Sequence, residues 1–215
     1  MKIAFLGAGQ VGGALAAALA RAGHTVTIGA RDAGSRSVRA LLTRAPALSV
    51  AAPADAVRAA DVVFLATPYN VAAEVVKELA GELAGKVLVD CTNPVGPGLT
   101  HGLRSERSGS EVVQAAAPRA RVVKAFTIYG FENFEENPFR SAAVRPAMLF
   151  CGDDAAAKGS VAKLIEELGW EPVDVGGIAQ ALHLEHMTLL WIRMVRVGGH
   201  SPHTVWARLS GPQPK

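Results

Sequence analysis

The chain has 215 residues, half of them hydrophobic, and a formal net charge of +3, which suits one substantial core or one core with a small appendage. Its basic side chains are scattered instead of forming a stripe with interleaved aromatic residues, which argues against a nucleic-acid partner. Its apolar runs are too short to span a bilayer, and Cys91 and Cys151 each end such a run, as expected of buried free thiols in a cytoplasmic protein.

The first 31 residues predict a strand, a glycine-rich turn, a helix and a second strand. Residues 2–6 are apolar, residues 7–12 read GAGQVG, and an Ala/Leu-rich stretch and a β-branched run follow. In this setting Gly7 permits the tight turn, Gly9 lets the backbone approach a pyrophosphate, and Gly12 lets the helix pack on the strand. We therefore expect a dinucleotide site, whose first contacts are Gly7, Gly9, Gln10, Val11 and Gly12.

The end of the second predicted strand indicates which dinucleotide is bound. An NAD site usually has Asp or Glu there, but this chain has Ala30 followed by Arg31. A guanidinium can hold a 2′-phosphate through two hydrogen bonds, whereas a carboxylate would repel it. Arg31 is therefore the first candidate for a phosphate clamp and Arg36 the second, which favours NADP; a small rotation of the loop would instead aim Asp32 at the ribose.

Strand and helix signals continue to alternate along the rest of the chain. The pattern predicts helices at residues 35–44, 53–59, 71–83, 111–117, 155–168 and 179–197. It predicts strands at residues 48–50, 61–65, 86–90, 121–126, 147–151 and 171–175. Residues 129–146 read as a loop rich in aromatic side chains, and residues from 198 onward read as an extended tail that is ordered only if it docks.

This alternation indicates the α/β class, with a Rossmann-type, doubly wound parallel sheet and a small C-terminal helical extension. No linker divides the chain, so we expect one domain over residues 1–215. Within it, residues 128–215 are expected to form the acceptor site and an interface.

The carboxyl ends of parallel strands meet at one edge of the sheet, and several polar residues follow these strand ends. Their hydroxyl and amide groups can orient a ribose or a nicotinamide amide without supplying a titratable proton, although each one alone is as often a turn or cap residue. No cluster with metal-ligand spacing is present, so we expect no metal. The residues expected at the cofactor are Ala66, Thr67, Pro68, Thr92, Asn93, Pro94 and Thr127.

Candidate proton donors are few, and the sequence leaves the catalytic residue open among Lys124, Tyr129 and His186. Lys124 lies within an apolar strand, so its amine is either paired nearby or has a depressed pKa. His186 lies on an apolar helix, where a core or interface histidine is the commoner role. This scarcity favours hydride transfer to a flavin-like ring, because reduction of a ketone or imine usually needs a proton donor.

These motifs, taken together, resemble those of a known family: the short NADPH-dependent coenzyme F420 reductases and related dinucleotide-binding oxidoreductases. That family is similar to the reductase domain of the STEAP ferric reductases. The resemblance runs from residue 1 to about residue 195. It departs from the family at Thr127, where Asn is frequent, and at Ala30, where Ser is common. The matching segments, in order, read GAGQVG, AGH, IGAR, ATP, DCTNP, VVKAF, GDD and LLWI.

The resemblance implies NADPH as cofactor, a 2′-phosphate contact at Arg31, and, where a deazaflavin is used, its position beside the nicotinamide under the C-terminal part. The favoured function is hydride transfer between NADPH and a flavin or deazaflavin, with a small-molecule electron acceptor as the partner. Two alternatives are open: a reductase of a small carbonyl or imine with Lys124 or Tyr129 as the acid, and an NADP-sensing module without chemistry.

We also expect a homodimer. The predicted helix at residues 179–197 is apolar over more than one face, and clustered aromatic residues often mark interaction sites. The alternative is that this helix and the loop at residues 129–139 close over the core of their own chain.

Overall fold

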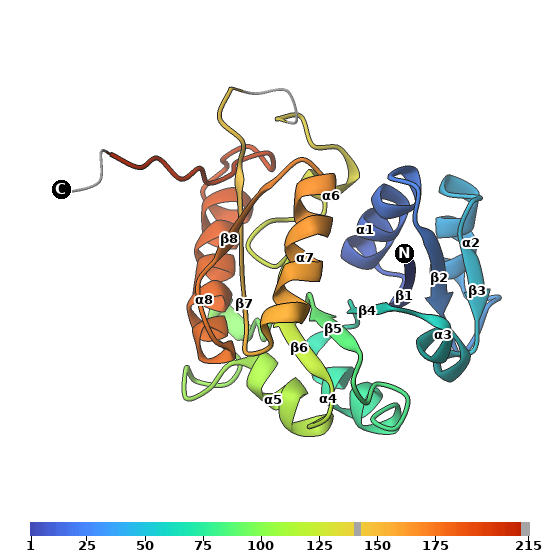
Figure 1. Cartoon of the computed structure of the whole chain (residues 1–215). Helices are drawn as coiled ribbons and strands as arrows, with labels where there is room; N and C mark the ends of the chain where they lie inside the picture. The colour runs from blue at the N-terminus through green and yellow to red at the C-terminus, as the bar shows by residue number, and fades with distance from the viewer. Residues whose placement is uncertain (140–142, 212–215) are drawn as a thin grey trace.

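The computed structural model describes residues 1–139 and 143–211 (Figure 1). It contains one eight-stranded sheet with the order β3-β2-β1-β4-β5-β6-β7-β8. The strands are β1 Lys2–Leu6, β2 Thr25–Gly29, β3 Ser49–Ala51, β4 Val62–Leu65, β5 Val87–Asp90, β6 Arg121–Lys124, β7 Ala147–Gly152 and β8 Glu171–Asp174. The α-helices are α1 Gln10–Arg21, α2 Arg36–Arg44, α3 Pro53–Ala59, α4 Tyr69–Glu78, α5 Gly109–Ala116, α6 Glu132–Glu135, α7 Ala155–Glu167 and α8 Ala181–Ile192.

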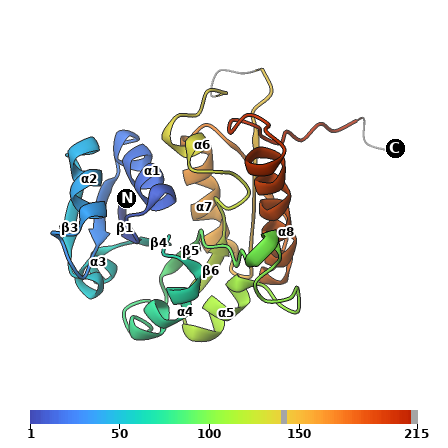
Figure 2. The same cartoon turned by 180° about the vertical axis from the view of Figure 1, so that it is seen from behind.

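Helices cover both faces of the sheet, as the apolar strands require. Along β1, Ile3 and Phe5 join one buried cluster while Ala4 and Leu6 join the other, because successive side chains of a strand point to opposite faces. The first cluster contains side chains of α1 and α7, and the second contains side chains of α3, α4 and α5. The N-terminal elements lie at one end of the sheet and α8 at the other in both views (Figures 1 and 2).

The expected α/β architecture is confirmed, but the sheet is not wholly parallel. Strands β1 to β6 pair in parallel, whereas β7 runs antiparallel to β6. A parallel return needs a crossover that carries the chain back across the sheet, usually as a long helix. The connection from β6 to β7 instead holds only the four-residue α6 among its described residues, so β7 starts from the edge where β6 ends.

Three predicted elements end earlier than the pattern suggested. Strand β6 stops at Lys124 because Phe126 has φ 55°, which breaks the extended backbone. Helix α4 ends at Glu78, and turns continue to Gly85 at φ 74°. Helix α8 ends at Ile192 and continues as a π-helical turn over Arg193–Val197.

The aromatic segment after β6 packs within its own chain. Tyr129 stacks on Trp170 with ring centroids 5.1 Å apart, and Phe134 meets the edge of the same ring. The tail docks on this segment, since Trp206 N donates to the hydroxyl of Tyr129 and Asn133 Nδ2 donates to Pro202 O. Residues 140–142 of the predicted loop and residues 212–215 of the predicted tail lie outside the described residues.

Both cysteines are buried free thiols, as predicted. Among residues 1–139 and 143–211, every helix is too short or too polar to cross a membrane.

Candidate functional site

The glycine turn between β1 and α1 is shaped by close backbone packing at two of its glycines. Gly7 has φ 116°, and a Cβ placed there would lie 2.4 Å from Ala66 O. A Cβ on Gly12 would lie 2.3 Å from Gly7 O. These contacts hold the turn tightly against the end of β4, so substitution at either position would displace the backbone.

Gly9 differs from its two neighbours, because a Cβ placed on it meets no described atom within 4 Å. Gly9 is the N-cap residue of α1, and the helix start has no side-chain cap. The first amides of α1 are therefore turned to open space, at the positive end of the helix dipole. This cradle suits a pyrophosphate and would be filled by any side chain at Gly9.

A cavity of about 400 Å³ opens beside the glycine turn. Arg31 lies on its wall with residues from the ends of β1 and β2, and α4 forms another wall. The floor is mainly apolar and the rim carries a cation, which suits the adenosine half of a phosphorylated dinucleotide. The lining residues are Leu6, Gly7, Gly29, Arg31, Ala52, Pro53, Ala54, Thr67, Val75, Glu78 and Leu79.

The structure separates the groups expected around the 2′-phosphate. Arg31 is exposed at the cavity, whereas Arg36, the first residue of α2, is not among the lining residues. Asp32 Oδ1 accepts a hydrogen bond of 2.8 Å from Gly34 N, so this carboxylate is used in a local turn. Ala30 donates its N–H to Ala51 O, which fixes the backbone just before Arg31.

Two threonine hydroxyls at the strand ends are available to a ligand. Thr67 Oγ1 and Thr127 Oγ1 are both buried and make no hydrogen bond with any residue that the structure describes. Thr67 lines the cavity, and Thr127 follows β6 and is 2 % exposed. Buried hydroxyls normally have partners, so these two fit a site that polar ligand atoms complete. Together with the open cradle at Gly9, they fit a dinucleotide.

Asn93 lies beside Thr127, and a residue of α8 is hydrogen-bonded to its side chain. Asn93 Nδ2 is 3.4 Å from Thr127 O, and Thr188 Oγ1 lies 3.1 Å from Asn93 Oδ1 and 2.9 Å from Thr127 O. One hydroxyl of α8 therefore joins the ends of β5 and β6. Thr188 was not recognised in the sequence, since a single Thr in a helix carries no signal of such a role.

Of the other residues predicted to contact the cofactor, some are exposed and some are buried. Thr92 is 3 % exposed and donates its hydroxyl to Asp90 Oδ1 at 2.7 Å, so it faces inward and is committed to the core. Pro94 is buried and Pro68 is exposed as the N-cap residue of α4. Thr67, Asn93 and Thr127 therefore remain the polar candidates for the nicotinamide end.

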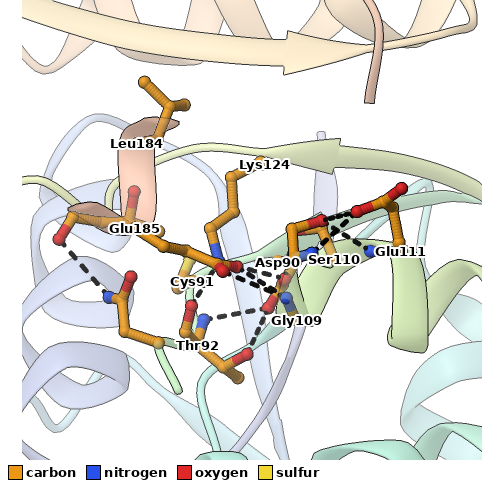
Figure 3. A network of polar contacts seen from close by, with 12 residues as sticks. Asp90, Cys91, Thr92, Gly109, Ser110, Glu111, Lys124, Leu184 and Glu185 are labelled. Carbon is orange, nitrogen blue, oxygen red and sulfur yellow. Dashed lines mark hydrogen bonds and ion pairs between the residues drawn. The ribbon is translucent and has the colours of Figure 1, made fainter. Parts of the chain in front are cut away.

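A buried network of charges lies beneath these strand ends (Figure 3). Lys124 Nζ is 3.3 Å from Asp90 Oδ2 and 3.0 Å from Glu185 Oε1, and it also donates to Thr92 O. Burial alone lowers the pKa of Lys124, but the two carboxylates outweigh it and the pKa is raised. Of the two expectations for Lys124, the paired amine is confirmed and the depressed pKa is wrong.

Glu185 connects four parts of the chain through this network. Its carboxylate accepts from Gly109 N at 2.9 Å, at the start of α5, and from His101 Nε2 at 2.8 Å. His101 Nδ1 accepts from the backbone N–H groups of Leu103 and Ser105, so the ring proton is on Nε2. The sequence did contain a signal for Glu185, since it is an acid within an apolar helix.

The other two catalytic candidates, Tyr129 and His186, are both hydrogen-bonded to other parts of the chain. Tyr129 is 3 % exposed, and its hydroxyl donates to Ala147 O at 2.7 Å while accepting from Trp206 N. Burial raises the pKa of this phenol, and its hydrogen bond with Trp206 N anchors the tail. His186 is exposed on α8 and lies 2.9 Å from Ser105 Oγ.

Comparison with known proteins identifies what the chain is similar to. Residues 2–94 match the family model described as NADP oxidoreductase, coenzyme F420-dependent. The chain is 30 % identical over 211 residues to the F420-dependent NADP reductase of Methanocaldococcus jannaschii, covering 89 % of this chain and 91 % of that protein. A crystal structure from Arthrobacter sp. FB24, assigned to the F420-dependent NADP reductases, superposes with a TM-score of 0.83 at 35 % identity, over 93 % of this chain and 95 % of that chain.

A longer relative matches over part of its length. The metalloreductase STEAP3 of Rattus norvegicus is 30 % identical over 189 residues, which are 87 % of this chain. The chain spans only 36 % of that relative.

Proposed function

The chain belongs to the coenzyme F420-dependent NADP oxidoreductase family, and from this premise we propose that it transfers hydride between NADPH and a flavin or deazaflavin such as F420. The observation that carries the proposal is the open cradle at Gly9 beside a cavity that presents Arg31. Bound NADPH would supply the hydride, and the chain's own residues would bind and orient it.

At the adenosine end, the amides at the start of α1 bind the pyrophosphate and Arg31 holds the 2′-phosphate. The support is that Arg31 lines the cavity while the neighbouring Asp32 is used in its own turn; Glu78, an acid that also lines the cavity, comes from α4 on another wall. Arg36 is the second cation for the same phosphate. Its exposed position at the start of α2 lets its long side chain approach from outside the cavity.

At the nicotinamide end, Thr67, Asn93 and Thr127 orient the ribose and the carboxamide. The two threonine hydroxyls have no partner among the described residues, and the Asn93 amide keeps one N–H beyond its contact with Thr127 O. Thr188 holds Asn93 and Thr127 in register from α8. These groups position the cofactor without exchanging protons with it.

Residues 128–215 supply the acceptor side in this proposal, within one domain that covers residues 1–215. Support comes from the antiparallel turn after β6, which keeps this segment at the edge where the strand ends lie. Two free buried thiols support a reducing, cytoplasmic setting.

A rapid-mixing experiment tests the acceptor. NADPH oxidation is followed with F420, FMN, FAD, a ferric chelate and a cyclic imine as separate acceptors, each with enzyme at equal concentration. We expect the largest kcat/KM with F420 or a flavin. Oxidation with the imine alone would establish the carbonyl or imine reductase alternative, and tight NADPH binding without turnover of any acceptor would indicate a sensing module.

A further inference from the structure

Hydride transfer to a flavin or deazaflavin leaves one proton to be delivered, and this inference rests on the proposed function. NADPH, the oxidised acceptor and one proton give NADP⁺ and the dihydro acceptor. The hydride forms a C–H or N–H bond on the acceptor ring, and a ring nitrogen takes the proton. General acids contribute about 10²–10⁴-fold to such steps.

Two of the three candidates recognised in the sequence, Lys124 and Tyr129, are held in hydrogen bonds within the chain, and the third, His186, is exposed on α8 and lies 2.9 Å from Ser105 Oγ. Lys124 is fully buried and bonded to Asp90, Glu185 and a backbone carbonyl. The hydroxyl of Tyr129 is bonded to β7 and the tail. The threonine hydroxyls at the strand ends do not titrate near neutral pH.

Tyr69 differs from these candidates in its position in the fold and in the solvent exposure of its side chain. It is the first residue of α4, two residues after Thr67, and so it stands where β4 ends. Its ring edge packs on the first residue of α5: a Cβ placed on Gly109 would lie 2.7 Å from Tyr69 Cε2. The side chain is half-buried, and its hydroxyl makes no hydrogen bond with any residue in the described ranges.

We propose that Tyr69 is the catalytic residue that donates the proton to the acceptor. Its phenolic O–H bond breaks as the proton moves to the acceptor ring, and the phenolate recovers a proton from water through the exposed side of the ring. The phenol ring packs beside Gly109, whose N–H donates to Glu185, and Tyr69 follows Thr67 by two positions after the end of β4. It therefore borders the strand ends where the nicotinamide is proposed to lie.

The surroundings of Tyr69 favour the protonated, neutral form of its phenol. Burial raises its pKa, and so do Glu185 on α8 and Asp90 on β5. Arg107, before α5, and Lys124 on β6 oppose them without reversing the shift. A phenol that remains protonated at neutral pH can act as an acid, and a positive charge nearby would favour its ionisation.

Titration of the phenol tests its position without any turnover. The chain has two tyrosines, and burial of Tyr129 places its ionisation at higher pH, so the first rise in tyrosinate absorbance reports Tyr69. Saturating NADP⁺, whose nicotinamide is cationic, should lower the midpoint relative to saturating NADPH. Tyr69→Phe should abolish this transition, while Tyr129→Phe should retain it.

Kinetics with the acceptor supply the second test. Tyr69→Phe should lower kcat about 100-fold, leave the dissociation constant of NADPH unchanged, and remove the fall in rate at alkaline pH. Asn70→Ala, at the exposed next position of α4, should match the unmodified enzyme.

The outcomes separate the two claims. An equal midpoint with both bound cofactor forms, or an unchanged kcat and pH profile in Tyr69→Phe, would overturn the role of Tyr69 and leave the proposed function intact. Failure of the unmodified protein to bind either cofactor form would overturn the proposed function itself.

Discussion

At the residue scale, the proposed cofactor site depends on single residues at the end of β2 and in the glycine turn. The wall of the cavity presents the guanidinium of Arg31, and the carboxylate of the adjacent Asp32 is bonded to Gly34 N. A guanidinium binds a phosphate dianion through paired, charge-assisted hydrogen bonds, whereas a ribose hydroxyl offers it far less. In the proposed function, preference for NADPH over NADH therefore depends on the side chain of Arg31.

We predict that the unmodified protein binds NADPH more tightly than NADH, and that Arg31→Ala removes most of the difference. Hydrogen bonds to charged groups contribute about 1.5–3 kcal/mol, or roughly tenfold to 100-fold in affinity. Calorimetric titration with both cofactors measures the difference. Arg39→Ala, an exposed cation elsewhere on α2, is the matched control and should keep the preference. Equal affinities for the two cofactors in the unmodified protein would contradict the NADP assignment.

The glycine turn gives a prediction in which neighbouring positions behave oppositely. Gly9→Val should remain folded, because its Cβ meets no described atom within 4 Å and its φ of −74° suits any residue, but it should lose NADPH binding. Gly12→Val should instead lower stability, because its Cβ would lie 2.3 Å from Gly7 O. Circular dichroism, thermal melts and cofactor titration separate the two effects. Normal NADPH binding by folded Gly9→Val would place the phosphates elsewhere.

At the scale of elements, α8 lies in the segment proposed to form the acceptor side and is bonded to the sheet. Glu185 joins α8 to β6 through Lys124 and to the start of α5 through Gly109, and Thr188, one turn later, contacts the ends of β5 and β6. Both residues lie on the buried face of the helix. Movement of α8 would therefore displace the polar groups that are proposed to orient the nicotinamide.

Glu185→Gln should destabilise the protein strongly. The amide removes the negative charge opposite Lys124, so the buried Lys124 ammonium loses a charged partner. The N–H group of the amide would also face the N–H donors that the carboxylate now accepts from, such as Gly109 N. Breaking one side of a buried pair costs about 3–5 kcal/mol. The free energy of unfolding in urea measures the loss, with the exposed Glu166→Gln on α7 as control. A loss no greater than that of the control would show that the network contributes little to stability.

At the scale of the whole molecule, the surface available for the expected dimer interface is smaller than the sequence suggested. Tyr129 and Phe134 are buried in their own chain, so they are not available to a partner. The outer face of α8 and its π-turn is exposed, with Leu190 at 52 % and Val197 at 65 %. His183, His186 and Arg193 share that face. Together with Leu190 and Val197 they follow one another at spacings of three to four residues.

We predict a homodimer that uses this face of α8. Light scattering at micromolar concentration should give twice the mass of the chain, and Leu190→Asp should give the mass of one chain while NADPH affinity is retained. Arg39→Ala, on α2, should remain dimeric. A monomeric mass for the unmodified protein would refute the dimer and leave α8 as a surface helix.

Several features could be predicted from the sequence because they depend on neighbours along the chain. The GAGQVG turn between a strand and a helix, the residues of α3 and the apolar runs of β4 and β5 all follow from local spacing and burial pattern. The positions of Gly7, Gly9 and Gly12 predict the cradle for the same reason, and the free hydroxyls of the strand ends follow once the strands are known to be parallel.

Other features depend on groups that are distant in sequence, and only the tertiary structure decided them. Lys124 meets Glu185, 61 residues later, and their pairing raises a pKa that burial alone would have lowered. The antiparallel β7 and the docked tail are both bonded to the hydroxyl of Tyr129, which joins residues 18 and 77 positions away. Local pattern determines which residues are buried, but the partner of a buried charge or hydroxyl is chosen by how the elements pack, because desolvated polar groups must find one another in three dimensions.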